Sequence, residues 1–163
     1  MKFNHGGTIL LGETTKLVGD SLRLKYGLFG RQNLLSGKEF FNQYFEFCLD
    51  KDKANIARTK FSSYVNFLAN LTSVDGALVL SDCFSLHGFG AEILLRPENI
   101  KIENPFSNSH GMRHRSAYYF VDRVPNSLAI VMSQDGGNKV IYKSLGEVKI
   151  IQDYEKERLD LLL

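Results

Sequence analysis

Residues 127–132 read Ser-Leu-Ala-Ile-Val-Met, and this stretch decides the predicted fold. Five apolar residues in succession, followed by the polar segment 133–137, predict a buried β-strand. Gly136-Gly137 then turns the chain toward Val140-Ile141-Tyr142, and Glu147–Ile151 has the composition of a further strand. The C-terminal third of the chain therefore predicts a β-sheet.

Further strands are predicted on the N-terminal side of this stretch. The apolar run 8–11 follows Gly6-Gly7 and predicts a buried strand, and 77–80 predicts another. Residues 85–87 and 91–95 are separate strand candidates, divided by two glycines. Residues 12–36 have a mixed composition punctuated by glycine, and no element is predicted there.

Helical periodicity alternates with these strands. Ser36 and Glu39 fit a capping box before an amphipathic helix over 38–49, and a second amphipathic helix is predicted over 53–70. Shorter helices are predicted over 116–123 and 153–162. This alternation predicts an α/β fold with a mixed central β-sheet flanked by helices.

The composition excludes several classes of protein. The 163 residues are 44% hydrophobic and include 12 Phe and 7 Tyr, which is too apolar for a disordered chain. No run approaches the ~20 apolar residues of a membrane-spanning helix, and two cysteines do not make a disulfide framework. The net charge of +2 argues against an extended nucleic-acid surface. We expect a cytoplasmic protein.

A chain of this length predicts one hydrophobic core. We assign one domain to residues 1–152 and a helical tail, serving as a linker, to 153–163. The short distance between Met1 and the first strand suggests a domain excised from a longer protein.

A compact basic segment stands between a polar loop and a helix. Arg113 and Arg115 flank His114, and guanidinium groups bind phosphate oxygens in a bidentate manner. A helix N-terminus adds free N–H groups, and Gly111 would let a ligand approach the backbone. Considered alone, such a triplet is more often a solvated surface, and a single histidine is more often packed or capping.

Two carboxylates occur beside turns at the ends of strands. Asp75 precedes Gly76-Ala77 and a strand, and Asp135 follows Ser133-Gln134 after another strand. Each could simply stabilise a turn. Together they could hold Mg²⁺, which proteins bind with one or two carboxylates plus substrate phosphates. With the arginines, this set suits metal-assisted phosphoryl or nucleotidyl transfer.

In this order, the three segments 75–77, 113–115 and 133–137 resemble the signature of the diadenylate cyclase domain, the DisA N-terminal-like (DAC) family. The resemblance covers residues 70–142 and includes the flanking strands. It implies a mixed central sheet wrapped by helices, binding of ATP with Mg²⁺ or Mn²⁺, and condensation of two ATP into cyclic di-AMP. It also implies a homodimer, in which two protomers meet face to face with one ATP each.

The resemblance assigns a role to each matching position. Asp75 would bind the metal and help activate the 3′-hydroxyl, and Asp135 would be the second acidic group at the metal. The remaining matching positions would bind the nucleotide and its phosphates: Gly76, Ala77, Gly111, Met112, Arg113, His114, Arg115 and Ser133.

Two departures from the family pattern favour an alternative. Met112 replaces a threonine whose hydroxyl could bind phosphate, and Asp135 replaces a longer glutamate. A shorter side chain can move a carboxylate beyond the ~0.5 Å tolerance of a preorganised site. The alternative is a catalytically weak or inactive sensor domain, which binds a nucleotide or cyclic dinucleotide and regulates an effector. A third interpretation is an α/β domain without a ligand. Three aromatic residues could stack on adenine or pack in the core: Phe84, Phe89 and Phe106.

Overall fold

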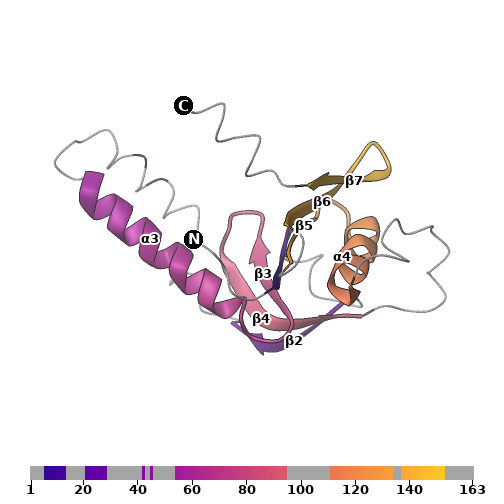
Figure 1. The fold of residues 1–163 in the computed structure, drawn as a ribbon, viewed down its shortest axis with the longest axis horizontal. Coiled ribbons are helices and arrows are strands. Elements are labelled where there is room, and N and C mark those ends of the chain that lie inside the picture. Colours follow the sequence, from indigo (N-terminus) through magenta and orange to yellow (C-terminus); the bar gives the residue numbers. More distant parts are fainter. Residues whose placement is uncertain are drawn as a thin grey trace.

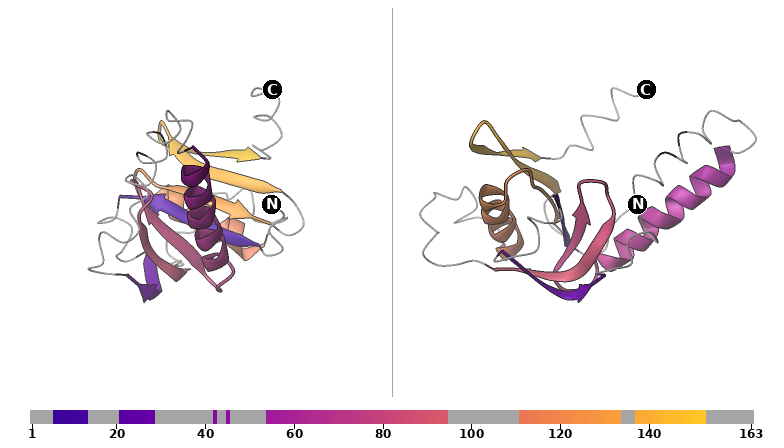
Figure 2. Two further views of the ribbon diagram at one scale, coloured as in Figure 1. Left: turned by 90° about the vertical axis from the view of Figure 1, so that its left-hand side faces the viewer. Right: turned by 180° about the vertical axis from the view of Figure 1, so that it is seen from behind.

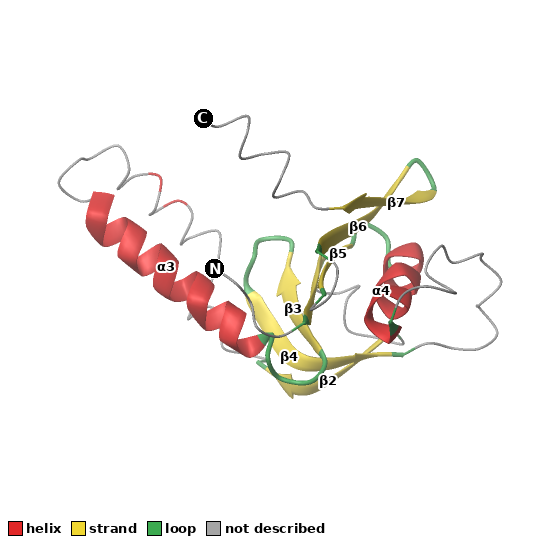
Figure 3. Ribbon diagram, in the orientation of Figure 1, coloured by secondary structure: helices red, strands yellow, loops and turns green. Residues whose placement is uncertain are grey.

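A computed structural model describes residues 6–13, 21–28, 54–94, 111–133 and 137–152, together with the helical positions 42 and 45. The described elements form one seven-stranded mixed sheet with a helix on either side, as Figures 1 and 3 show. In chain order they are β1 (Gly7–Gly12), β2 (Leu22–Gly27), α3 (Ala54–Leu71), β3 (Ala77–Ser81), β4 (Leu86–Ile93), α4 (Met112–Arg123), β5 (Leu128–Met132), β6 (Asn138–Ser144) and β7 (Glu147–Gln152).

The strand order is β2-β4-β3-β1-β5-β6-β7, which places β1 in the middle of the sheet. β1 pairs in parallel with β3, with Thr8 opposite Ala77, and antiparallel with β5, with Thr8 opposite Val131. The other pairings are antiparallel, and β5, β6 and β7 form a meander. The prediction of an α/β fold with a mixed sheet is confirmed.

A separate hydrophobic cluster lies on each face of the sheet, one under α4 and one against the C-terminal end of α3. Because successive side chains of a strand point to opposite faces, Leu10 and Val79 join the cluster under α4, whereas Ile9, Leu78 and Leu80 join the cluster under α3. The α4 cluster is the larger of the two and extends from Leu22 in β2 to Ile141 in β6. Figure 2 shows the sheet between the two helices from two further directions.

Most of the predicted strands are confirmed within a residue or two, but 85–87 and 91–95 form one strand, β4. The two glycines between them do not end the strand, because each lies at a shift in register against β3. The register runs through the pairs Ala77–Ala91, Val79–Gly88 and Leu80–Leu86. β4 therefore carries extra residues, as in β-bulges, where glycine is favoured.

β2 is an element that the sequence analysis missed. Leu22 is buried, Arg23 is exposed and Leu24 is half-buried, so the strand alternates as an edge strand should. It pairs with β4 in a single register, from Leu22 opposite Ile93 to Gly27 opposite Gly88. The strand was not predicted because the glycines around it are typical of turns.

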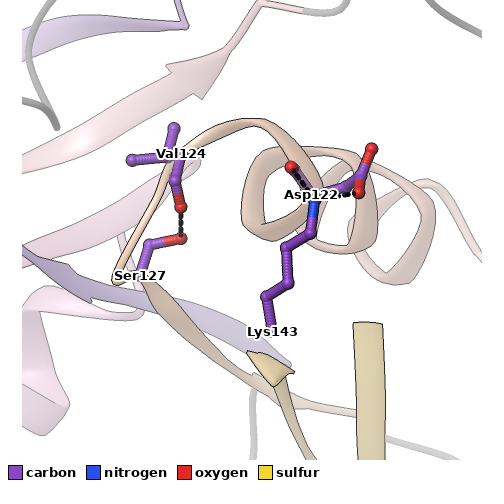
Figure 4. A network of polar contacts seen from close by, with 4 residues as sticks. All are labelled: Asp122, Val124, Ser127 and Lys143. Atoms are coloured by element: carbon purple, nitrogen blue, oxygen red, sulfur yellow. Dashed lines mark hydrogen bonds and ion pairs between the residues drawn. The ribbon is translucent and has the colours of Figure 1, made fainter. Parts of the chain in front are cut away.

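α4 begins at Met112, four residues before the predicted start. The capping position is Gly111, which has no side chain to signal a helix start. At the other end, Figure 4 shows the contact of the helix with β6 and a hydrogen bond within the turn that leads to β5. Lys143 Nζ donates to Asp122 Oδ1 at 2.7 Å and to Asp122 O at 2.8 Å, and Ser127 Oγ donates to Val124 O at 2.7 Å.

Several predictions fall outside the described residues: the tail 153–163, and the helix 38–49 apart from Asn42 and Phe45. The predicted helix 53–70 is confirmed as α3. Within the described part of the chain, neither helix is both long and apolar enough to span a membrane.

Candidate functional site

A cavity of about 670 Å³ lies between the β2–β4 edge of the sheet and the first turn of α4. Five of the described elements contribute to its walls, namely β1, β2, β3, β4 and α4, together with the turn that leads from α3 into β3. The lining residues are Thr8, Arg23, Leu24, Lys25, Asp75, Gly76, Ala77, Gly90, Ala91, Glu92, Ile93, Met112, Arg113 and Ser116. The cavity thus brings together residues from two of the three segments that the sequence analysis singled out.

The segment Asp75-Gly76-Ala77 contributes to the cavity wall where the turn after α3 leads into β3. Asp75 is exposed, whereas Ala77 is buried at the start of β3. Gly76 has φ +110°, and a Cβ built on it would lie 2.5 Å from the carbonyl carbon of Gly90. Only glycine allows β3 and β4 to approach this closely, so the backbone of β4 fixes the direction in which Asp75 leaves the sheet.

The first turn of α4 provides a second wall. Met112 is 65% exposed and Arg113 is also exposed. The intrahelical bonds begin one residue later, where His114 N and Arg115 N donate to Gly111 O at 3.2 and 3.5 Å. The amides of Met112 and Arg113 therefore stand at the positive end of the helix dipole, beside the cavity.

The other residues of this segment do not line the cavity. His114 is only 6% exposed and lies on the buried face of α4. Arg115 Nη2 contacts Met112 Sδ at 3.9 Å, and its Nε is buried without a hydrogen-bond partner among the described residues. Gly111 is exposed and has open space around it.

The third segment is described only at its ends. Ser133 follows β5, and its amide donates to Gly137 O at 3.3 Å, so the two ends of the segment meet. Ser133 is not among the residues that line the cavity. Asp135 lies outside the described residues.

The β2–β4 wall supplies charged residues that the sequence analysis missed. Arg23 and Lys25 come from β2, and Glu92 lies opposite Arg23 on β4. The signal that could have found them is the alternation Leu22-Arg23-Leu24-Lys25, which is typical of a half-buried strand. Among the described residues that line the cavity, three are therefore cationic and two are acidic.

The aromatic residues considered as adenine platforms lie elsewhere. Phe89 stacks on Tyr26 with a centroid distance of 4.8 Å and packs against the cluster under α3. Phe84 is 43% exposed, and its carbonyl accepts a hydrogen bond from Tyr64 Oη at 3.0 Å. Neither lines the cavity, and Phe106 is outside the described residues.

The donor set of the cavity suits a hard cation that is shared with a ligand. No group of three or more His, Cys, Asp or Glu side chains in the described ranges could hold a metal ion. Asp75 and Glu92 both offer exposed carboxylates there, and Glu92 is paired with Arg23. Mg²⁺ often takes one carboxylate with phosphate oxygens and water. The described residues are thus compatible with a metal that arrives with a phosphate-bearing ligand.

Arg113, the free N–H groups of α4 and the β2 cations can bind anionic oxygens, and Asp75 can bind a cation or accept a proton. Searches with the sequence found no matching family model and no matching curated protein.

Proposed function

We propose that this domain binds a nucleoside triphosphate together with a divalent cation in the cavity between β2, β4 and α4. The observation that carries the proposal is that Asp75 and Arg113 line one cavity although they are distant in sequence. A carboxylate beside cations and a helix N-terminus is a suitable environment for a metal-bound polyphosphate.

The resemblance to diadenylate cyclases supports a specific reaction, the condensation of two ATP into cyclic di-AMP across a homodimer. The 3′-oxygen of one ATP forms a bond to the α-phosphorus of the other, and the bond from that phosphorus to pyrophosphate breaks. Two such transfers release two pyrophosphates and two protons. Mg²⁺ or Mn²⁺ would neutralise phosphate charge when bound.

In this proposal the residues of the chain bind the nucleotide and its cation and orient them for the reaction. Asp75 holds the cation and receives the proton of the 3′-hydroxyl, and Arg113 with the α4 amides holds phosphate oxygens. Gly76 and Ala77 keep the backbone close to the nucleotide, because neither carries a bulky side chain.

A second candidate function is nucleotide sensing without turnover. It is favoured by the first turn of α4, where Arg113 lines the cavity but His114 and Arg115 do not, and where Met112 offers no hydroxyl. A phosphate held by fewer groups would be bound but poorly activated for attack.

The experiment that tests the proposal incubates the full chain with ATP and Mn²⁺ and measures cyclic di-AMP and pyrophosphate, with ATP binding followed by calorimetry. Product formation with a more than linear dependence on protein concentration supports the cyclase. Binding without product supports the sensor, and absence of ATP binding overturns both.

Two variants assign the roles within the site. Arg113→Ala should weaken ATP binding about tenfold or more, as expected for loss of a charge-assisted hydrogen bond. Arg123→Ala removes the same charge from the last turn of α4 and should leave binding unchanged. Asp75→Asn should reduce the Mn²⁺ dependence of binding, and an unchanged Mn²⁺ dependence would contradict its role.

A further inference from the structure

The β2–β4 wall of the cavity carries an ion pair that has no part in the proposed chemistry. Arg23 on β2 lies directly opposite Glu92 on β4, and both line the cavity. Lys25 lies two residues beyond Arg23 on the same strand, so its side chain leaves the same face of β2. This wall thus carries two neighbouring cations and one carboxylate, so its net charge is positive.

The Arg23–Glu92 contact uses only part of each group. Arg23 Nε donates to Glu92 Oε2 at 3.0 Å, and Nη2 donates to the same oxygen. A guanidinium has five N–H donors in a planar fork, so donors remain for a second acceptor. Glu92 Oε1 takes no part in this contact, and the arrangement is not the two-oxygen fork of a strong arginine–carboxylate pair.

Both partners are accessible to water, with side chains 69% and 59% exposed. Exposed ion pairs contribute little to stability, since solvent screens them and ordering two long side chains costs entropy. A phosphate group carries more charge than a carboxylate and presents oxygens that fit the guanidinium fork. A phosphate entering the cavity can therefore replace Glu92 as the partner of Arg23 without unfolding the wall.

We infer that Arg23 is a phosphate-binding residue, and that Glu92 competes with the ligand's phosphate for it. This inference rests on the proposed nucleotide site and names a determinant of its specificity. The competition favours ligands with a polyphosphate chain over those with one phosphate, because only the more highly charged group displaces the carboxylate effectively. Glu92 acts here as a selectivity element.

The competing explanation for Glu92 is a second metal ligand beside Asp75, and the two explanations predict opposite signs. If Glu92 competes with phosphate, Glu92→Gln strengthens ligand binding. If Glu92 binds the metal, the same substitution weakens metal-dependent binding. The sign of one affinity change therefore separates them.

The test measures binding of ATP, AMP and inorganic tripolyphosphate to the full chain by calorimetry, with and without Mg²⁺. Glu92→Gln should strengthen binding of ATP about three- to tenfold and of AMP less, and Arg23→Gln should weaken ATP binding about tenfold, in the range of single charge-assisted contacts. In the Arg23→Gln background, Glu92→Gln should have much less effect, because the competition acts through Arg23.

A matched control is available on β7. Glu147 forms an exposed pair with Lys149 at 3.7 Å, away from the cavity lining, so Glu147→Gln removes the same charge without touching the site. It should leave all three affinities unchanged. Because all of these side chains are exposed, the variants should retain the thermal midpoint of the parent protein.

The outcomes separate this inference from the proposed function. If ATP binds but Glu92→Gln leaves its affinity unchanged or lowers it, the competition is overturned and the nucleotide site stands. If ATP does not bind but tripolyphosphate binds with the expected pattern of variants, the competition stands and the nucleotide proposal fails. If neither ligand binds to the parent protein or to Glu92→Gln, both are overturned.

Discussion

The two helices that flank the sheet differ in how much of their surface is buried. α4 is 12 residues long, and six of its side chains are buried, with Phe120 and Val121 at 1% and 0% exposure. α3 is 18 residues long, yet none of its described side chains, over 59–71, is buried. Of these, only Leu68 and Leu71, near its C-terminal end, pack against the described core, and Figure 1 shows the helix extending away from the sheet.

This difference teaches that burial, and not length, decides which helix positions the site. α4 holds Arg113 rigidly because the rest of the helix is packed on the sheet and fastened to Lys143. α3 acts through its last turn alone, because Thr72 Oγ1 donates to Ala69 O at 2.7 Å and the chain then turns toward Asp75. Four predictions test this contrast.

The largest effect should come from the core of α4. Phe120→Ala should lower the free energy of unfolding by about 3–5 kcal/mol, because it removes a fully buried ring and leaves a void. Leu68→Ala on α3 should cost less than about 2 kcal/mol, since this half-buried side chain has less apolar area to lose. Urea denaturation measures both, and equal losses would refute the contrast.

The turn after α3 should be the next most sensitive position. Gly76→Ala should cost about 2–3 kcal/mol and weaken ATP binding, because it strains a positive φ and forces a Cβ onto the backbone of Gly90. Gly146→Ala is the matched control: its φ is +85°, but nothing lies within 4 Å of the added Cβ. The control should cost less and leave ATP binding intact. If the two variants lose the same stability, the contact with Gly90 has no role.

A smaller effect is expected at the start of α4. Gly111 has φ −65° and ψ 170°, which suit a capping residue, and it makes no side-chain capping bond. Gly111→Ser should therefore raise the free energy of unfolding by roughly a few tenths of a kcal/mol, the advantage of serine over glycine as a cap, and raise the thermal midpoint slightly. Calorimetry of thermal unfolding measures this, and a lowered midpoint would contradict the geometry of the cap.

The smallest expected effect is on stability at alkaline pH, and it involves one tyrosine on each helix. Burial raises the pKa of Tyr64 on α3 above 10.0, and burial with the neighbouring Asp122 and Tyr119 raises the pKa of Tyr118 on α4. Both pKa values are higher in the folded state. The stability that the two protonated phenols contribute is therefore fully present below pH 10.0 and is lost as the pH rises through the folded pKa.

Replacing either tyrosine with phenylalanine should flatten this alkaline loss of stability, as measured by urea denaturation across the pH range. Tyr64→Phe should in addition lower stability at neutral pH, because it removes the bond from Oη to Phe84 O. An unchanged alkaline slope in both variants would exclude these phenols as its source.

The strands with continuous apolar runs were predictable, since β5 and β3 contain few polar residues and no glycine. β2 was not, because its alternation is short and lies among glycines that normally mark turns. The start of α4 was misplaced because Gly111 caps the helix without a side-chain bond, so no capping residue marks the boundary in the sequence.

The site was predictable only where a segment meets the cavity through consecutive residues, as at Asp75-Gly76-Ala77. Within the basic segment, a sequence does not reveal which residue faces the sheet, and the rotation of α4 buries His114 while leaving Arg113 at the cavity. Arg23 and Glu92 lie far apart in the chain, and only the pairing of β2 with β4 brings them together.

The central position of β1 also has a consequence for how the chain folds. β1 pairs with residues 77–81 and 128–132, and its pairing with β5 closes the longest loop among the described strand pairs. The C-terminal meander, in contrast, forms from neighbours in sequence. During synthesis β1 emerges first but cannot complete its pairing until β5 has left the ribosome, which makes its insertion a late step of high contact order. Until then the edge of β1 that pairs with β5 is open to wrong partners, even if β3 already covers the other edge.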